Sequence, residues 1–212
     1  WRLGWVCGHE RIVRALADTF YDQAHYERGI EAYELLLKLD PTSRDAPQWV
    51  LSIAQGYDTL EDYPKLRATY DRLLTNYTGQ GSWARTQSDP KLVAEVQERV
   101  RGLILQSALA AHGKAQRDKS SLAEFEAAAS LYELYLSRFK DHPQAYDVHY
   151  NLADIQFHRT NKPSEAATNY LAAARSMPES VAAKEAGNKL RHDALYNALS
   201  ALERLRVTEL EQ

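Results

Sequence analysis

The sequence has 212 residues, of which 44% are hydrophobic and 26% are charged, a composition typical of a folded protein rather than a disordered chain. The formal net charge is −3, from 26 basic and 29 acidic residues, so the chain lacks the cationic excess that nucleic-acid binding requires. No apolar stretch approaches the ~20 residues needed to cross a bilayer. The chain has only 9 Gly and 7 Pro, and this scarcity favours helices.

The first predicted element is a helical hairpin at about residues 9–41. Apolar or aromatic residues recur at i, i+3, i+4 and i+7 along its first helix, which places them on one helical face. These residues are Val13, Leu16, Ala17 and Phe20. The matching face of the second helix is formed by Gly29, Tyr33 and Leu36. Pro41 then ends the hairpin, because proline cannot continue a helix.

A second predicted hairpin, at about residues 45–77, repeats this pattern at an offset of 37 residues. Its corresponding residues are Val50, Ile53, Ala54, Tyr57, Leu66, Tyr70, Leu73 and Thr78. One hairpin cannot bury its own apolar face, so we expect the hairpins to stack on one another.

The second half of the chain is predicted to continue the array with two further hairpins and a final helix. Ser88-Asp89-Pro90 is typical of a helix start and opens a hairpin at about residues 90–140, with a polar turn at 118–121. A fourth hairpin, at about 144–177, carries Tyr150, Ala153, Asp154, Phe157, Ala166, Tyr170, Ala173 and Pro178 at the repeating positions. A capping helix at about 179–207 brings the total to about nine helices and no strand.

These three sets of residues resemble the tetratricopeptide repeat. That repeat has an apolar residue, Leu, a small residue and Tyr on its first helix, and a small residue, an aromatic, Ala and Pro on its second. The resemblance implies an all-α, right-handed superhelical solenoid of stacked antiparallel helical hairpins, forming a single domain over residues 1–212. Because the chain begins with Trp1 instead of Met, we expect it to be part of a longer protein.

Segments 131–139 and 150–154 are similar in style to tetratricopeptide proteins of bacterial cell-envelope assembly and motility complexes. This similarity implies a protein–protein interaction scaffold in the periplasm or at the outer membrane, with a protein or peptide segment as its partner. Two alternatives remain open. One is a cytoplasmic adaptor or regulatory protein, and the other is a helical superhelix accessory to an enzyme domain outside this chain.

The sequence predicts no catalytic, cofactor or metal site, and hence no enzyme. No His-Glu-x-x-His or Cys/His spacing for zinc occurs, and no strand precedes a Ser nucleophile. In tetratricopeptide arrays the concave groove is lined by residues one, five and eight places after the first repeating position of the first helix. The resemblance therefore places a partner-binding groove at Arg14, Asp18, Tyr21, Leu51, Gln55, Asp58, Asn151, Ile155 and His158.

Arg14 and Tyr21 are the expected anchors of that groove, since Arg and aromatic residues supply much of the binding energy at interfaces. In the family's best-known binding mode, a clamp of Lys and Asn holds the C-terminal carboxylate of a peptide. Asp18 stands where that clamp has Asn and would repel a carboxylate, so an extended or helical segment is the expected ligand instead. Glu34 and Lys38 are expected on the opposite, convex side. If the groove does not bind the partner, the long central helix from Lys91 and the loop at Trp83 are the next places to look for a binding surface.

Overall fold

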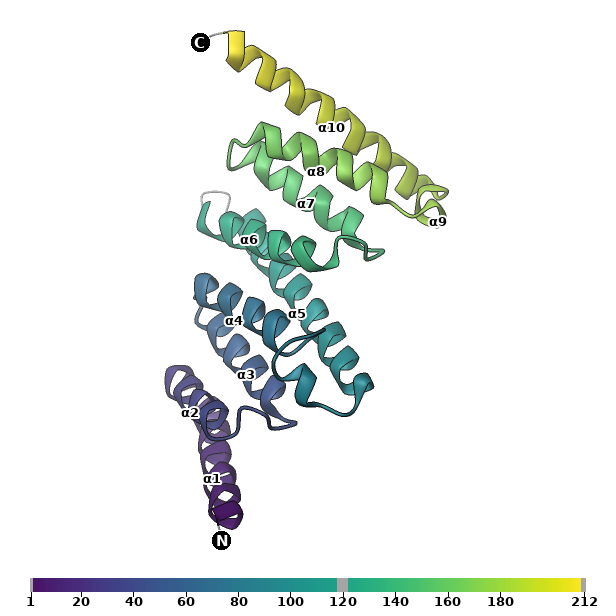
Figure 1. Ribbon diagram of the computed structural model, residues 1–212. Helices are drawn as coiled ribbons and strands as arrows, with labels where there is room; N and C mark the ends of the chain where they lie inside the picture. Colours follow the sequence, from purple (N-terminus) through teal and green to yellow (C-terminus); the bar gives the residue numbers. More distant parts are fainter. Residues whose placement is uncertain (1, 118–121, 211–212) are drawn as a thin grey trace. The chain divides into compact units, whose positions relative to one another are not determined.

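The computed structural model describes residues 2–117 and 122–210, with side chains for 9–117 and 122–207 (Figure 1). Over this part of the chain the regular secondary structure consists of ten α-helices and one short 3-10 helix, without a strand. The prediction of an all-α chain of consecutive helical hairpins is confirmed, with one α-helix more than the predicted nine. The predicted polar turn at 118–121 lies outside the described residues.

The chain divides into two compact units, the first ending at residue 103 and the second beginning at residue 104. The first unit contains α1 (Arg2–Asp22), α2 (Tyr26–Leu39), α3 (Ala46–Thr59), α4 (Tyr63–Asn76), η1 (Ala84–Thr86) and the first part of α5 (Pro90–Arg117). Its helices pack in chain order, α1 on α2, α2 on α3 and α3 on α4. The single domain predicted over both units stays a prediction.

The core of the first unit follows the repeating positions read from the sequence. Ala17 and Ala54 are completely or almost completely buried, and these small residues let the second helix of each hairpin approach closely. Tyr33 and Tyr70 fill the space beside them. Leu16 is an exception, with 47% of its surface exposed, because no described helix precedes α1 to cover that side.

The loop between α4 and α5 is held against the loop between α2 and α3. The indole nitrogen of Trp83 donates a hydrogen bond of 2.7 Å to the carbonyl oxygen of Ser43, and Trp83 is only 2% exposed. A Cβ atom at Gly81 would collide with the carbonyl group of Asn76, so only glycine fits this turn. Trp83 therefore has a structural role in this unit.

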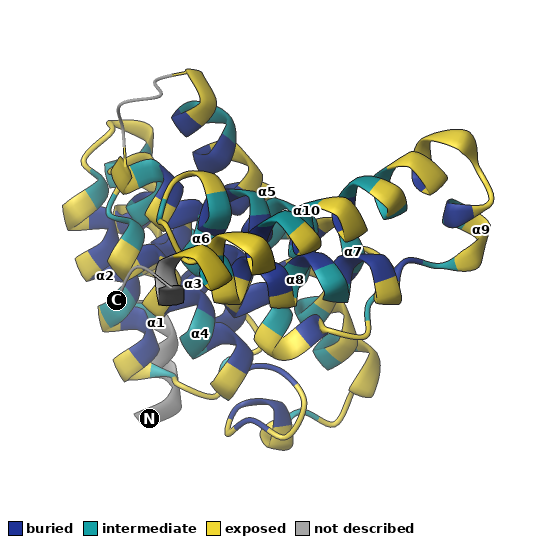
Figure 2. Ribbon diagram, turned by 90° about the horizontal axis from the view of Figure 1, so that it is seen from above, coloured by how far each residue is buried: buried dark blue, intermediate teal, exposed yellow. Residues whose placement is uncertain are grey.

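The second unit contains the rest of α5, α6 (Leu122–Phe139), α7 (Ala145–His158), α8 (Pro163–Ser176), α9 (Glu179–Ala182) and α10 (Glu185–Leu210). Helix α6 packs on α7, α7 on α8, and α10 on both α8 and α9. The ring of His112 on α5 meets the rings of Phe125 and Tyr132 on α6, which joins these two helices. Buried residues line the facing sides of the helices (Figure 2).

The predicted final helix differs from the structure in its start and in its buried face. It is interrupted after Ala182, and the continuous helix begins at Glu185. Its buried face consists of small residues, Ala194, Ala198 and Ala201, whereas the neighbouring leucines Leu195, Leu199 and Leu202 are exposed. Small side chains allow α10 to lie close to α8, where leucines would hold the two backbones apart.

Candidate functional site

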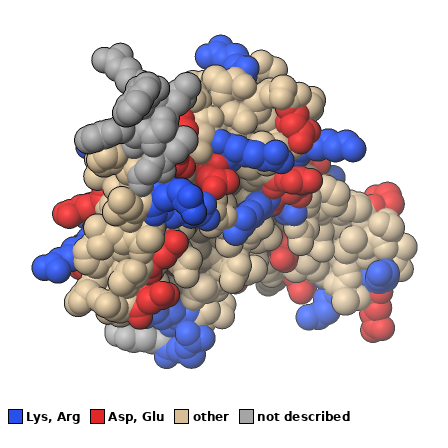
Figure 3. All heavy atoms as spheres, turned by 90° about the horizontal axis from the view of Figure 1, so that it is seen from below, with Lys and Arg blue, Asp and Glu red and all other residues tan. Residues whose placement is uncertain are grey.

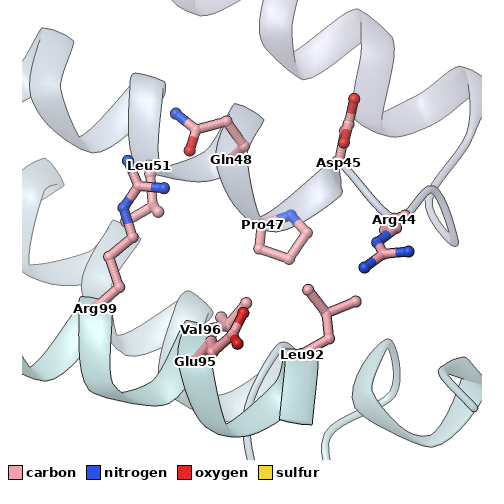
Figure 4. Close-up of a pocket in the computed structure, with 9 residues that line it drawn as sticks. All are labelled: Arg44, Asp45, Pro47, Gln48, Leu51, Leu92, Glu95, Val96 and Arg99. Atoms are coloured by element: carbon pink, nitrogen blue, oxygen red, sulfur yellow. The ribbon is translucent and has the colours of Figure 1, made fainter. Parts of the chain in front are cut away.

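A cleft of about 350 Å³ lies in the first unit between α3 and the N-terminal part of α5 (Figure 4). We call it the α3–α5 cleft, and it is lined by Arg44, Asp45, Pro47, Gln48, Leu51, Leu92, Glu95, Val96 and Arg99. The lining residues of α5 fall at i, i+3, i+4 and i+7, which places them on one helical face. Those of α3 come from its first two turns. The loop before α3 supplies the remaining two residues.

The cleft has an apolar floor and a charged rim. Pro47 and Leu51 are buried in its floor, and Leu92 and Val96 are half-buried beside them. On the rim, the carboxylate of Asp45 forms an ion pair of 2.9 Å with the guanidinium of Arg14. The remaining rim charges belong to exposed side chains that form no ion pair with another described side chain, and these are Arg44, Glu95 and Arg99. The cleft therefore offers apolar surface together with unpaired charges.

The structure places the predicted groove residues of the first unit in different surroundings. Leu51 belongs to the floor of the α3–α5 cleft, and Arg14 reaches its rim through Asp45. Gln55, which is exposed, and Asp58, which is half-buried, lie further along α3 and do not line the cleft. The cleft thus brings together only part of the predicted set.

Tyr21 and Asp18 take part in packing within the first unit. The Tyr21 hydroxyl donates a 2.5 Å hydrogen bond to the carbonyl oxygen of Ser52, and its ring lies edge-on to the ring of Tyr33 at 5.4 Å. Burial raises the pKa of the Tyr21 hydroxyl well above its usual value. The Tyr33 hydroxyl in turn donates to Asp18 at 2.5 Å. The ring of Tyr21 also occupies the space that a Cβ at Gly29 would need, so we reinterpret Tyr21 as a packing residue instead of a free anchor.

In the second unit, α7 is shifted by one residue from the predicted alignment. The small buried residue that corresponds to Ala17 is Ala153, and the residue after it, Asp154, accepts a 2.6 Å hydrogen bond from Tyr170. This bond matches the one from Tyr33 to Asp18. Ile155 is only 1% exposed because the shift turns its side chain into the core.

A second, smaller cleft of about 100 Å³ lies in the second unit, and we call it the α5–α7 cleft. It is lined by His112, Gln116, Phe125, Asp154, Ile155, His158 and Arg159. The predicted residues Ile155 and His158 therefore share a cleft, whereas Asn151 does not line it. Exposed His158 lies 4.0 Å from the carboxylate of Asp154. Among the side chains that the structure describes, no group of three or more could hold a metal ion.

Burial determines the protonation of His112 in the α5–α7 cleft. Its two ring nitrogens lie 3.2 Å from the Tyr132 hydroxyl and 3.2 Å from the side-chain nitrogen of Gln116. Burial lowers the pKa of His112, and the nearby charge of Arg159 lowers it further, while Asp154 opposes both. A neutral imidazole can accept the amide hydrogen of Gln116 and donate to Tyr132, so both polar partners are satisfied.

The sequence prediction assigned no α5 residue of the α3–α5 cleft to the groove, although it named the long helix from Lys91 as an alternative binding surface. Leu92, Val96 and Arg99 are spaced i, i+4 and i+7 on a helix that was predicted from its start signal. The third hairpin, however, was not aligned with the repeat, so none of its residues was assigned to the groove. The helical spacing within residues 91–99 was the signal that could have identified them.

Charged side chains are mixed on the surface. On the face shown in Figure 3, acidic and basic side chains are interspersed, with uncharged surface between them. This face offers no continuous basic stripe of the kind that a phosphate backbone binds. None of the helices in the described part of the chain is both long and apolar enough to cross a membrane.

Comparison with known proteins leaves the family unassigned. No known protein-family profile matches the chain, and neither does any curated protein. A solved structure of the MamA RS-1 ArsTM double mutant aligns over 96% of this chain and 96% of its own length, with 11% sequence identity and a TM-score of 0.36. A similarity this low carries no argument about function. The assignment of helical hairpins rests on the helix packing and the recurring buried positions described above.

Proposed function

We propose that this protein is a protein–protein interaction scaffold and that its α3–α5 cleft binds a segment of a partner protein. The observation that supports this proposal is the open apolar floor formed by Leu51, Leu92 and Val96 beneath a charged rim. Binding interfaces combine an apolar centre, where water is expelled, with a polar rim that fixes orientation. The cleft between α3 and α5 has both parts.

The cellular setting belongs to the same proposal. We place the scaffold in a bacterial envelope assembly, in the periplasm or at the outer membrane, on the similarity in style of residues 131–139 and 150–154. A cytoplasmic adaptor, or a helical module beside an enzyme domain, would use the cleft in the same way. Fractionation of cells that produce the full-length protein distinguishes an envelope location from a cytoplasmic one.

Site-specific photocrosslinking in the source organism tests the role of the cleft. A photoreactive amino acid replaces Gln48, which is exposed on α3 at the edge of the cleft. The matched control replaces Ala68, which is exposed on α4 in the same unit and does not line the cleft. We expect Gln48 to give a defined crosslinked partner that Ala68 does not give.

A further substitution links any crosslink to the floor of the cleft. Val96→Asp places a carboxylate on the apolar floor and should abolish the crosslink from position 48 while the melting temperature stays close to that of the wild type. A crosslink that survives Val96→Asp, or equal crosslinking from positions 48 and 68, would show that partners bind elsewhere.

A further inference from the structure

We infer that the segment bound in the α3–α5 cleft carries a carboxylate at each end of a short apolar stretch. This inference rests on the proposed function of the cleft and adds the chemistry of the partner. The two arginines that carry it, Arg44 and Arg99, are not among the groove positions assigned by the repeat resemblance. The partner class is therefore a protein with an acid-flanked apolar segment.

The two ends of the cleft each present an arginine. Arg99 on α5 lies at one end, and Arg44, in the loop before α3, lies at the opposite end near Leu92 (Figure 4). Both guanidinium groups are exposed and have no acidic partner among the described side chains. Guanidinium binds carboxylate through two parallel hydrogen bonds, and this geometry favours arginine over lysine at such sites.

The nearby acidic residues do not satisfy both of these arginines. Asp45 lies beside Arg44, but its carboxylate is already paired with Arg14 at 2.9 Å. Glu95 stands one helical turn before Arg99 and is exposed, so it competes with a partner only for the Arg99 end. Since Asp45 is taken up by Arg14 from outside the lining, the cleft presents two arginines, Arg44 and Arg99, against one unpaired carboxylate, that of Glu95.

The floor of the cleft sets the spacing of the expected segment. Leu92 and Arg99 are seven residues apart on α5, which corresponds to a rise of ~10 Å. An extended segment advances ~3.3 Å per residue, so its two acidic residues are about three positions apart, with roughly two residues between them. At least one of these residues should be apolar to cover Val96 and Pro47. Glu95 disfavours a third carboxylate between them, which adds discrimination against uniformly acidic segments.

Selection from a random-peptide display library tests this inference. The wild-type protein is compared with the double variant Arg44→Glu, Arg99→Glu. The control variant Lys38→Glu, Arg85→Glu makes the same change in charge at two exposed positions of the first unit outside the cleft. Circular dichroism melts first establish that all three proteins fold alike. We expect the wild type and the control to enrich acid-flanked apolar peptides.

The double variant should lose these peptides, and their affinity should fall roughly tenfold for each arginine reversed. Enriched peptides without an excess of flanking acids, or acid-flanked peptides that still bind the double variant, would overturn the inference. A parallel selection with Val96→Asp distinguishes a failure of this inference from a failure of the proposed binding role of the cleft. If enrichment depends on Val96 but not on carboxylates, the inference fails and the cleft's role stands. If the Val96→Asp variant enriches the same peptides as the wild type, both the inference and the proposed role of the cleft fail.

Discussion

At the scale of single residues, a tyrosine hydroxyl recurs as the polar link between the two helices of a hairpin. In three hairpins it lies against the residue that directly follows a buried alanine of the first helix. The pairs are Tyr33 with Asp18, Tyr132 with His112, and Tyr170 with Asp154, at 2.5, 3.2 and 2.6 Å. Each ring fills the core while its hydroxyl hydrogen-bonds to a polar partner on the other helix. The same side chain therefore fixes both the distance between the two helices and their register.

The first prediction concerns the hydroxyl of Tyr33. Burial and the hydrogen bond to Asp18 raise the pKa of Tyr33 to about 12, so the hydroxyl is a neutral donor at ordinary pH. Tyr33→Phe keeps the ring and removes the donor, and it should lower the free energy of unfolding by about 1 kcal/mol. Tyr196→Phe is the control, because Tyr196 is 70% exposed on α10. Urea unfolding curves that shift equally for both variants would contradict this role.

The second prediction concerns the ring of Tyr70, which is buried between α3 and α4. Tyr70→Ala should lower the free energy of unfolding by ~3–5 kcal/mol, because it removes a large core aromatic and leaves a cavity. Tyr196→Ala makes the same truncation at an exposed position and should change stability by no more than ~0.5 kcal/mol. Urea unfolding followed by circular dichroism measures both. A small effect at Tyr70 would mean that α4 does not use this face for packing.

At the scale of helices, the sequence predicts which elements exist better than it predicts their registers and faces. Periodicity and proline positions located both hairpins of the first unit, because those signals are local. The register of α7 was off by one, since Ala153 and Asp154 could exchange roles until the partner of Tyr170 was known. The buried stripe of α10 could not be predicted either. Alanine and leucine both suit a helix interior, and only the closeness of α8 selects alanine.

The third prediction tests the junction between α9 and α10. A Cβ atom at Gly187 would collide with the backbone carbonyl of Val181, and a backbone group cannot move aside as a side-chain tip can. Gly187→Ala should therefore lower the free energy of unfolding by ~1–3 kcal/mol. Gly102→Ala is a matched control in the exposed part of α5, where nothing lies within 4 Å. It should raise stability by ~0.5–1 kcal/mol, because alanine favours helix over glycine.

Thermal unfolding followed by circular dichroism compares the two variants with the wild type. Opposite signs are the expected result. Stabilisation by both substitutions would show that α10 can begin without its close contact to Val181, and that the interruption after Ala182 has another cause.

At the scale of the whole molecule, composition and periodicity were enough to predict an all-helical array of hairpins. They were not enough to predict its clefts. The α3–α5 cleft depends on which faces of α3 and α5 meet, and on a loop that brings Arg44 to the rim. Rim charge also depends on partners distant in sequence, as Arg14 and Asp45 show. Such pairings become visible only once the helices are placed.

The last prediction concerns the response of the protein to acid. Burial lowers the pKa of both His112 and His149 in the folded state, so the unfolded chain binds protons at a higher pH than the folded chain. Both imidazoles are neutral in either state well above the ordinary pKa of about 6.5, and their contribution to stability is then complete. As the pH falls below that value, the unfolded state gains protons first, and the free energy of unfolding decreases.

The double variant His112→Gln, His149→Gln should lose less stability than the wild type between pH 7.5 and 5.5, although carboxylates contribute to both proteins. Urea unfolding followed by circular dichroism measures this difference, and the range from pH 7.5 to 8.5 is an internal control in which the two proteins should change in parallel. If the variant is as sensitive to acid as the wild type, protons gained by other groups dominate the response.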